Sequence, residues 1–379
     1  MPVILGILLA VAGPRLAMDP AELCDPMLFM GPEPDTFDLD AFIERELAWR
    51  PGYWRKALDN SRLYWPMVSR RVREAGLPQE LTWLPLIESA FESDALSRKG
   101  ALGIWQFIPS TAKAEGLRVD MWVDERLDPI KSTDAALSHL RSLYAIFGDW
   151  NLALAAYNAG SGRVWWALYQ ASVGGKKKKR RRVPRKVKEM WIKKGDVWDF
   201  WDAQGYFPNE TRRYVPLFYA ALASVERAGE FGVNLADTLA YPFASDTVFV
   251  DYPTDLALVA ELLGMPLDSV ALRNPELAVG LTPPDTLWPL RVPPGKGQGL
   301  DSLLKTIEPK DVTIWISYKA QRGDNLWKLA KRYGTTPEHL AEVNGLSLKK
   351  KLKLYQRLKI PKKVKARSRR NEIYMGKKK

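Results

Sequence analysis

Glu88 lies in a sequence setting where a glutamate can act as an acid near neutral pH. If its surroundings form a helix with about 100° per residue, Leu81, Leu84 and Phe91 share a face with Glu88. Burial in such an apolar stripe disfavours the ionised carboxylate and raises its pKa. The spacing therefore makes Glu88 a candidate proton donor. The structural alternative is a glutamate that escapes to water at a helix end or pairs with Lys or Arg.

Further polar side chains follow Glu88 along the chain. Ser97 lies in a polar, glycine-containing stretch that we expect to form a loop or short hairpin, and Gln106 closes the string GIWQ. Tyr157 and Asn158 end an otherwise apolar helical stretch. From position alone, these two would cap the helix and satisfy buried backbone groups.

The order of these motifs resembles a known enzyme family. Glu88-Ser89, then Ser97, then Gly103-Ile104-Trp105-Gln106, then Ala156-Tyr157-Asn158 resembles the lytic transglycosylases of the soluble-transglycosylase type. The longer strings LPLIESAF, VDERLDPIKSTDAALSHL, DWNLALAAYNAG and ETRRYVP are similar to the membrane-bound type D subgroup. The similarity runs from about Phe37 to Pro216.

The resemblance implies a mainly α fold, with a lysozyme-like helical catalytic domain over residues 36–230. It also implies a reaction in which Glu88 protonates the glycosidic oxygen between N-acetylmuramic acid and N-acetylglucosamine. The resulting carboxylate then takes the proton of the 6-hydroxyl of the same muramyl ring, which attacks its own anomeric carbon and leaves a 1,6-anhydro end. An intramolecular attack needs positioning rather than a second carboxylate. The substrate-binding roles that the resemblance implies fall on Ser97, Gln106, Tyr157, Asn158, Glu210 and Tyr214.

Two other functions stay open. In a hydrolase similar to goose-type lysozyme, Glu92 or Asp94 would lie roughly 6 to 9 Å from the acid and activate a water. In a non-catalytic wall-binding protein, the catalytic domain would be inactive. The presence of Glu88, Gln106 and Asn158 argues against the second alternative.

The first residues resemble a secretory signal. Val3–Ala12 is an apolar run too short to span a bilayer, followed by small residues. We therefore predict a signal segment over residues 1–24 and action in the cell envelope, in the periplasm. Cys24 is the sole cysteine, so no intramolecular disulfide forms. Glu22-Leu23 before it match a lipid-attachment signal poorly, and membrane anchoring stays open.

The metal-binding residue types are scarce. The chain has two histidines, His139 and His339, and one cysteine. This set cannot build a His-rich zinc site, and a Cys-His nucleophile pair would depend on a cysteine near the N-terminus. We therefore predict no metal and no cofactor.

The net charge of +13 is concentrated in two segments. Residues 176–188 hold ten Lys or Arg, within a predicted basic loop insertion over 174–194, and residues 349–379 hold fifteen, ending in a basic tail over 362–379. The rest of the chain is net negative. A nucleic-acid groove would need basic and aromatic residues interleaved on a folded face, so we predict no nucleic-acid partner. Anionic envelope polymers suit these segments better.

The C-terminal part contains a repeated pattern of strand, two helices and strand, over residues 247–293 and again over 315–361. The second copy resembles a LysM glycan-binding module, which implies peptidoglycan glycan strands as the partner. The first copy lacks the Gly-Asp-Asn-Leu loop, so its sugar binding is in doubt. The resemblance assigns glycan binding to Gly323, Asp324, Asn325, Leu326, Asn344, Gly345 and Leu346.

Overall fold

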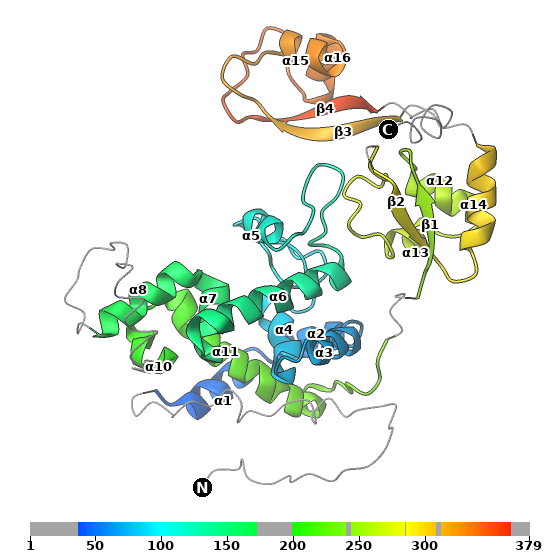
Figure 1. Cartoon of the computed structure of the whole chain (residues 1–379). Coiled ribbons are helices and arrows are strands. Elements are labelled where there is room, and N and C mark those ends of the chain that lie inside the picture. Colours follow the sequence, from blue (N-terminus) through cyan, green and yellow to red (C-terminus); the bar gives the residue numbers. More distant parts are fainter. Residues whose placement is uncertain (1–36, 173–198, 240–243, 285, 308–311, 365–379) are drawn as a thin grey trace, which may run out of the picture. The chain divides into compact units, whose positions relative to one another are not determined.

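The computed structural model describes residues 37–172, 199–239, 244–284, 286–307 and 312–364 (Figure 1). The predicted signal segment, Cys24, the basic insertion over 174–194 and the tail beyond residue 364 lie outside the described residues. The chain divides into two compact units. The first combines residues 1–106 with 133–240, and the second combines residues 107–132 with 241–379.

The first unit is helical. Its α-helices are α1 (Leu39–Trp49), α2 (Pro51–Ser61), α3 (Trp65–Glu74), α4 (Leu84–Ser89), most of α6 (Pro129–Phe147), α7 (Trp150–Ala159), α8 (Ser161–Ser172), α10 (Phe200–Ala203) and α11 (Asn209–Glu226). Polar caps set several of the starts. Asp38 accepts the Ala41 N–H at 2.8 Å, and Asp149 accepts the Leu152 N–H at 2.6 Å, so each aspartate satisfies an otherwise unpaired donor.

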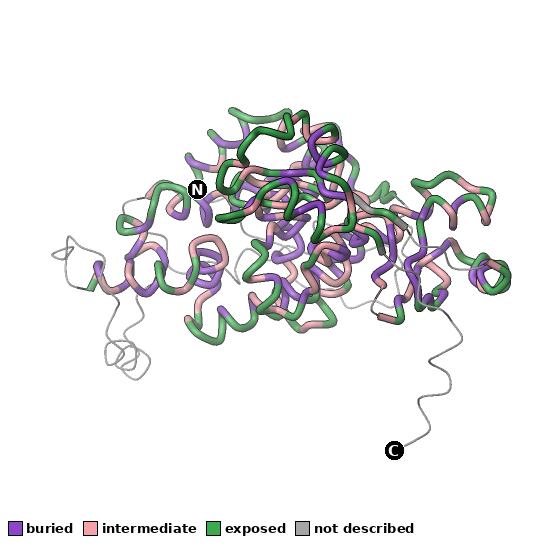
Figure 2. Tube along the Cα trace, turned by 90° about the horizontal axis from the view of Figure 1, so that it is seen from above, coloured by how far each residue is buried: buried purple, intermediate pink, exposed green. Residues whose placement is uncertain are grey.

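Helix α11 lies at the centre of this unit and packs against α1, α7 and α4. Its buried face includes Val215 and Phe218, both fully enclosed. Figure 2 shows buried and exposed positions alternating along the helices, as one-sided apolar patterning requires. Buried apolar residues on these helices therefore hold the unit together, and α4 and α11 also carry polar groups.

Two prolines mark where helices begin in this unit. Residues 51–75 contain two helices, and Pro66 lies in the first turn of α3, where its missing N–H has no helical partner to lose. The stretch after Pro78 forms a 3-10 turn, Gln79–Trp83, before α4 begins with Pro85 in its first turn. Glu88 therefore lies on a helix of only six residues.

The second unit contains two small modules. The first pairs strands β1 (Asp246–Val250) and β2 (Trp288–Val292), and includes α12 (Leu256–Leu263), α13 (Leu267–Ala271) and α14 (Gly297–Thr306). The second pairs strands β3 (Val312–Lys319) and β4 (Arg357–Val364), and includes α15 (Leu326–Tyr333) and α16 (Pro337–Val343). Both strand pairs are antiparallel, and the predicted order of strand, two helices and strand is present twice.

One asparagine holds each module together in the same way. Asn274 donates to the Val270 and Arg291 carbonyls and accepts the Arg291 N–H at 2.9 Å. Asn344 makes the same three bonds with Leu340 and Lys359, accepting the Lys359 N–H at 2.7 Å. The two copies are therefore equivalent in detail, with Asn274 corresponding to Asn344 and Arg291 to Lys359.

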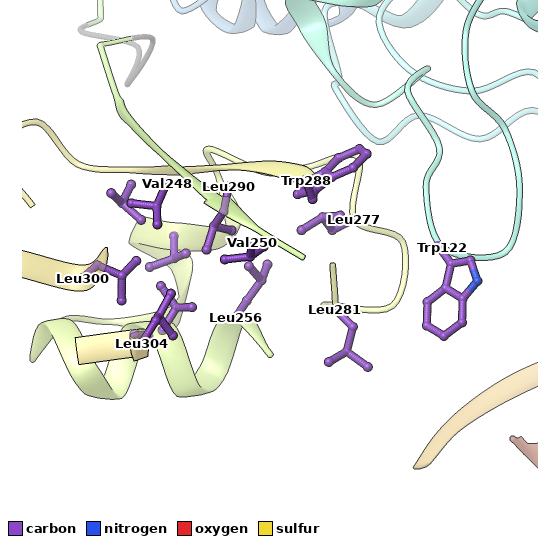
Figure 3. Close-up of a cluster of buried hydrophobic side chains, with 14 of the residues drawn as sticks. Trp122, Val248, Val250, Leu256, Leu277, Leu281, Trp288, Leu290, Leu300 and Leu304 are labelled. Atoms are coloured by element: carbon purple, nitrogen blue, oxygen red, sulfur yellow. The ribbon is translucent and has the colours of Figure 1, made fainter. Parts of the chain in front are cut away.

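Residues 107–132 belong to the second unit, although the sequence places them within the catalytic domain. This segment contains α5 (Pro109–Ala114) and contributes Trp122 and Val123 to the core of the first module. Figure 3 shows this core, with Trp122 at one end and Val248, Leu290 and Leu304 further in. The physical reason is apolar burial, since Trp122 is only 6% exposed there.

Candidate active site

The acid-bearing helix ends in a sharp turn. Ala90 and Phe91 directly follow α4 with φ of 52° and 55°, a left-handed conformation that is rare for a bulky residue. Neighbouring side chains support this turn. Asn60 donates to the Ala90 carbonyl at 2.9 Å, and Tyr53 donates to the Leu86 carbonyl at 2.6 Å. Such strain persists only where the surroundings fix it, and it is concentrated at functional sites.

The Glu88 side chain is half-buried and accepts a hydrogen bond from the Tyr214 hydroxyl. Burial raises the pKa of Glu88 to about 7, and the negative charge of Glu210 acts in the same direction. The Tyr214 hydrogen bond opposes this rise because it favours the ionised form. Both protonation states of Glu88 are therefore accessible near neutral pH, as an acid that later acts as a base requires.

Tyr214 comes from α11 and is buried. Burial and the adjacent Glu88 raise the pKa of Tyr214 well above its ordinary value, so the phenol stays neutral and acts as a donor. The sequence assigned Tyr214 to the lining of the cleft. The structure makes it a direct partner of the acid, a relationship that residues so far apart in sequence do not reveal.

Ser97 and Gln106 shape the loop between α4 and α5. The Ser97 hydroxyl accepts the Ala101 N–H at 2.9 Å, where the predicted hairpin forms a bridge between Leu96 and Leu102. The Gln106 amide nitrogen donates to the Ala95 and Gly103 carbonyls at 2.8 and 2.9 Å. Both side chains thus make bonds within the loop, and their predicted contacts with sugar stay predictions.

Three hydrogen bonds tie this loop to the helices around it. Ser89 donates to the Ile104 carbonyl at 2.9 Å, and Trp105 Nε1 donates to Thr133 Oγ1 at 2.9 Å. Tyr157 donates to the Trp105 carbonyl at 2.7 Å. Tyr157 therefore positions the loop that follows the acid, and its predicted role in binding the sugar stays a prediction.

Asn158 connects α7 to α11, because its Oδ1 accepts the Thr211 hydroxyl at 2.9 Å. Thr211 lies next to Glu210 in sequence. At the C-terminal end of α7, the Gly160 N–H donates to the Ala156 carbonyl at 2.7 Å and so caps the helix through the backbone. The observed bonds of Tyr157 and Asn158 thus reach other elements, which favours positioning over local helix capping.

The other carboxylates near the acid, in sequence or by their charge effect on it, have cationic partners or face solvent. Glu92 pairs with Lys56 at 2.5 Å, and Glu210 pairs with Lys99 at 3.0 Å. Asp94 is exposed. Among the described residues, no cluster of His, Cys, Asp and Glu could hold a metal ion.

The loop residues predicted to bind glycan in the second module largely build their own loops. Asp324 accepts the Tyr318 hydroxyl at 2.6 Å and the Gln321 N–H at 2.7 Å, and Asn325 caps α15. Gly323 and Gly345 take positive φ, Leu326 is buried, and Asn344 holds the β4 backbone as described above. Trp327 and Tyr355, which the sequence reasoning did not select, are 61% and 65% exposed.

Comparison with known families agrees with this architecture. Residues 68–180 match the family described as "Transglycosylase SLT domain" and residues 318–361 match "LysM domain". Residues 244–309 match "Lytic transglycosylase MltD, LysM-like domain". Residues 68–180 thus carry an SLT domain, and two LysM-type modules follow it. The resemblance to SLT-type transglycosylases with LysM modules and the mainly α fold class are confirmed.

Individual proteins are also similar to this chain. Membrane-bound lytic murein transglycosylase D of Escherichia coli K12 is 31% identical over 298 residues, which is 75% of this chain and 60% of that protein. The chain thus spans less than two thirds of that relative's length. Peptidoglycan transglycosylase gp16 of Escherichia phage T7 is 47% identical over 79 residues, 20% of this chain and 6% of that protein.

Among solved structures, the 70 kDa soluble lytic transglycosylase of Escherichia coli matches 46% of this chain and 25% of its own. The sequence identity is 23% and the TM-score is 0.32. In the described part of the chain, no helix has the length and apolarity needed to span a bilayer.

Proposed function

We propose that the protein is a lytic transglycosylase of peptidoglycan. It cleaves the β-1,4 bond between N-acetylmuramic acid and N-acetylglucosamine and leaves a 1,6-anhydro-muramyl end. The observation that carries the proposal is the Glu88–Tyr214 pair within an SLT domain. There a carboxyl group with a pKa of about 7 is hydrogen-bonded to a neutral phenol.

The proposed reaction uses Glu88 twice. Its proton passes to the glycosidic oxygen as the bond from that oxygen to the muramyl anomeric carbon breaks. The resulting carboxylate then takes the proton of the muramyl 6-hydroxyl, whose oxygen bonds to the same anomeric carbon. Burial favours the protonated carboxyl group before the first step, and the Tyr214 hydroxyl stabilises the carboxylate between the two steps.

A single catalytic carboxylate is consistent with the pairing of its neighbours. Glu92 and Glu210 each form an ion pair with a lysine. A hydrolase would need a second carboxylate to activate water or to attack the sugar. An attack by the muramyl 6-hydroxyl dispenses with this group, because the nucleophile is already held on the substrate.

The product distinguishes the functions. Purified sacculi are digested with the full chain and with the Glu88→Gln variant, and the muropeptides are measured by mass spectrometry. We expect wild-type products that lack one water at each new chain end. Ordinary reducing ends would identify a hydrolase, and an undigested sacculus that retains the protein would identify a binding protein.

We further propose that the second LysM module, residues 315–361, holds the enzyme on glycan strands in the cell envelope and that the periplasm is its site of action. The match of residues 318–361 to the LysM family supports this part. Weak sugar affinity is sufficient, since tethering raises the effective concentration of the catalytic domain on the polymer. The exposed Trp327 and Tyr355 supply aromatic surface suited to stacking on sugar rings.

A further inference from the structure

The two modules differ in what lies against their equivalent loops. In the second module, residues 346–348 follow Asn344 after α16. In the first module, the corresponding residues are 276–278, which follow Asn274 after α13. The shared asparagine bonds establish this correspondence. The contacts of this loop can therefore be compared between the two modules.

A tight hairpin, residues 118–125, faces the loop of the first module. Val119 and Asp124 form its bridge, and the Asp120 carboxylate accepts the Trp122 and Val123 N–H groups at 2.7 and 2.9 Å. Arg118 bonds Glu125 through both its backbone N–H, at 2.7 Å, and its carbonyl, at 2.9 Å. The hairpin is therefore a preformed unit within the segment that matches the SLT family.

The hairpin joins the loop by backbone pairing. The Asp124 N–H donates to the Glu276 carbonyl at 2.8 Å, the Ala278 N–H donates to the Trp122 carbonyl at 3.0 Å, and Val123 forms a bridge with Leu277. Trp122 and Val123 are both buried in the module's core (Figure 3). The loop at residues 276–278 therefore forms backbone bonds with another peptide segment, the hairpin.

A buried ion pair holds the same junction. Arg291 of β2 contacts the Asp128 carboxylate at 2.8 Å and also binds Glu276. Asp128 is fully buried and also caps α6 through the Ile130 and Lys131 N–H groups. The equivalent of Arg291 in the second module, Lys359, is exposed. The charge at this strand position is therefore used for docking in the first copy alone.

Aromatic contacts extend the junction. Trp288, at the start of β2, has the Arg118 guanidinium 5.9 Å and the Lys131 ammonium 5.5 Å from its ring. Both cations come from residues 107–132. Such contacts add specificity to a junction already closed by apolar burial.

The other loop of the first module is also engaged. The Thr254 N–H donates to the Thr282 hydroxyl at 2.8 Å, and the Thr282 N–H donates to the Thr254 carbonyl at 3.0 Å. The Leu256 N–H donates to the Gly280 carbonyl at 2.9 Å. Asp255 forms a bridge with Leu281. The segment between α13 and β2 therefore bonds to residues 250–255. These residues correspond to residues 320–325 of the second module.

We propose that the LysM-like module over residues 244–309 is a clamp whose ligand is the hairpin 118–125 of the same chain, and that it is not a glycan-binding module. Its loop at residues 276–278 is committed to the hairpin through backbone bonds. The clamped segment begins directly after Gln106 and ends directly before Thr133, the partner of Trp105. The clamp thus holds the middle of a segment that interrupts the active-site sequence.

Hydrogen–deuterium exchange on the full chain tests the clamp, with and without saturating N-acetylglucosamine oligomers. We expect residues 122–124 and 276–278 to be protected together without sugar, and the oligomers to leave this protection unchanged. Sugar-dependent protection of 276–278, or release of the hairpin by sugar, would overturn the proposal. Protection of residues 344–348 by sugar reports on the second module, so failure of the LysM part of the proposed function is seen separately.

A matched pair of variants supplies the second test. Arg291→Met leaves Asp128 and Glu276 without their shared cation, whereas Lys359→Met changes the equivalent exposed residue of the second module. We expect Arg291→Met to increase exchange at residues 118–125 at least tenfold and to raise KM or lower kcat on a short soluble glycan. Lys359→Met should do neither.

If Arg291→Met fails to fold, Trp122→Phe gives a milder change in the hairpin. We expect it to increase exchange at residues 276–278, the loop that the hairpin contacts, and to leave exchange at residues 344–348 unchanged. Exchange at 118–125 that is fast in the wild-type chain, or unaltered in both variants, would contradict the clamp. The kinetic measurements rest on the proposed function. The hydrogen–deuterium exchange measurements test the clamp whether or not the protein is a transglycosylase.

Discussion

The Tyr214 hydroxyl donates a hydrogen bond to the carboxylate of Glu88, a residue 126 positions away in sequence. The bond acts against burial: desolvation holds the proton on Glu88, and the phenol eases its release. The resulting pKa of about 7 suits one group that must first give and then take a proton.

Replacing the acid with its amide should abolish the reaction. Glu88→Gln can neither donate nor accept the proton, so we expect turnover of sacculi to fall by about 100-fold or more, with binding and circular dichroism unchanged. Turnover above roughly a tenth of wild type, a loss of less than about 1.4 kcal/mol, would remove Glu88 from this role.

The same variant should alter the pH dependence of stability. Because the folded-state pKa of about 7 exceeds the ordinary 4.5, wild-type stability falls as pH rises from 4.5 through 7. Glu88→Gln lacks this loss and should gain about 2 to 3 kcal/mol relative to wild type between pH 4 and pH 8. Urea unfolding at the two pH values measures the free energy of unfolding of each protein. The same change with pH in both proteins would contradict the assignment of Glu88 as a buried acid.

Two substitutions should move the pH profile in opposite directions. Tyr214→Phe removes a bond that favours the carboxylate, so the Glu88 pKa rises and the alkaline loss of kcat/KM moves to higher pH. Glu210→Gln removes a nearby negative charge, so the Glu88 pKa falls and the alkaline loss moves to lower pH. Rate profiles from pH 5 to 9 decide this, and shifts of the same sign would refute the arrangement.

Asn158 and Thr211 form a pair that can be broken from either side. Asn158→Ala and Thr211→Val should each lower kcat, by roughly tenfold or less, while the melting temperature changes by only a few degrees. The double variant should be no worse than the poorer single variant. Additive losses would show that Asn158 acts separately from Thr211, for instance on the sugar. Activity that simply follows the folded fraction would indicate a packing role.

Tyr157→Phe removes the bond to the Trp105 carbonyl without changing the ring. Because the bond positions the loop rather than the acid, we expect a lower kcat, while the loss of kcat/KM at alkaline pH stays at the same pH as in wild type. A shift in that pH would instead indicate a direct effect on Glu88. Tyr214→Phe, which is expected to shift it, is the matched control.

Truncation after Pro309 should separate attachment from chemistry. Removing the second module and the basic C-terminus should lower activity on insoluble sacculi and leave turnover of a short soluble glycan nearly intact. Pull-down at low and high salt distinguishes the two causes, since attraction by the basic end is screened whereas sugar binding is not. Retention that disappears in salt and ignores N-acetylglucosamine oligomers would exclude LysM-mediated attachment.

The sequence by itself determined the local features of this protein. The apolar pattern placed Glu88 among buried residues, although Leu81 and Phe91 lie outside α4 rather than on one helical face with it. The caps, glycines and prolines marked most helices, because these signals act over one or two turns. The repeated order of strand, two helices and strand also followed from local pattern. The motif order was sufficient to identify the SLT and LysM families.

Only the tertiary structure decided which distant groups meet. The Tyr214–Glu88 bond, the Tyr157–Trp105 bond and the docking of residues 118–125 on the loop 276–278 join segments that no periodicity relates. The sequence placed residues 107–132 within the catalytic domain because they are continuous with it. The family match over 68–180 includes them too, while burial of Trp122 and the pairing of Asp128 with Arg291 group them with the second compact unit. Apolar area and buried charge are satisfied by proximity in space rather than along the chain.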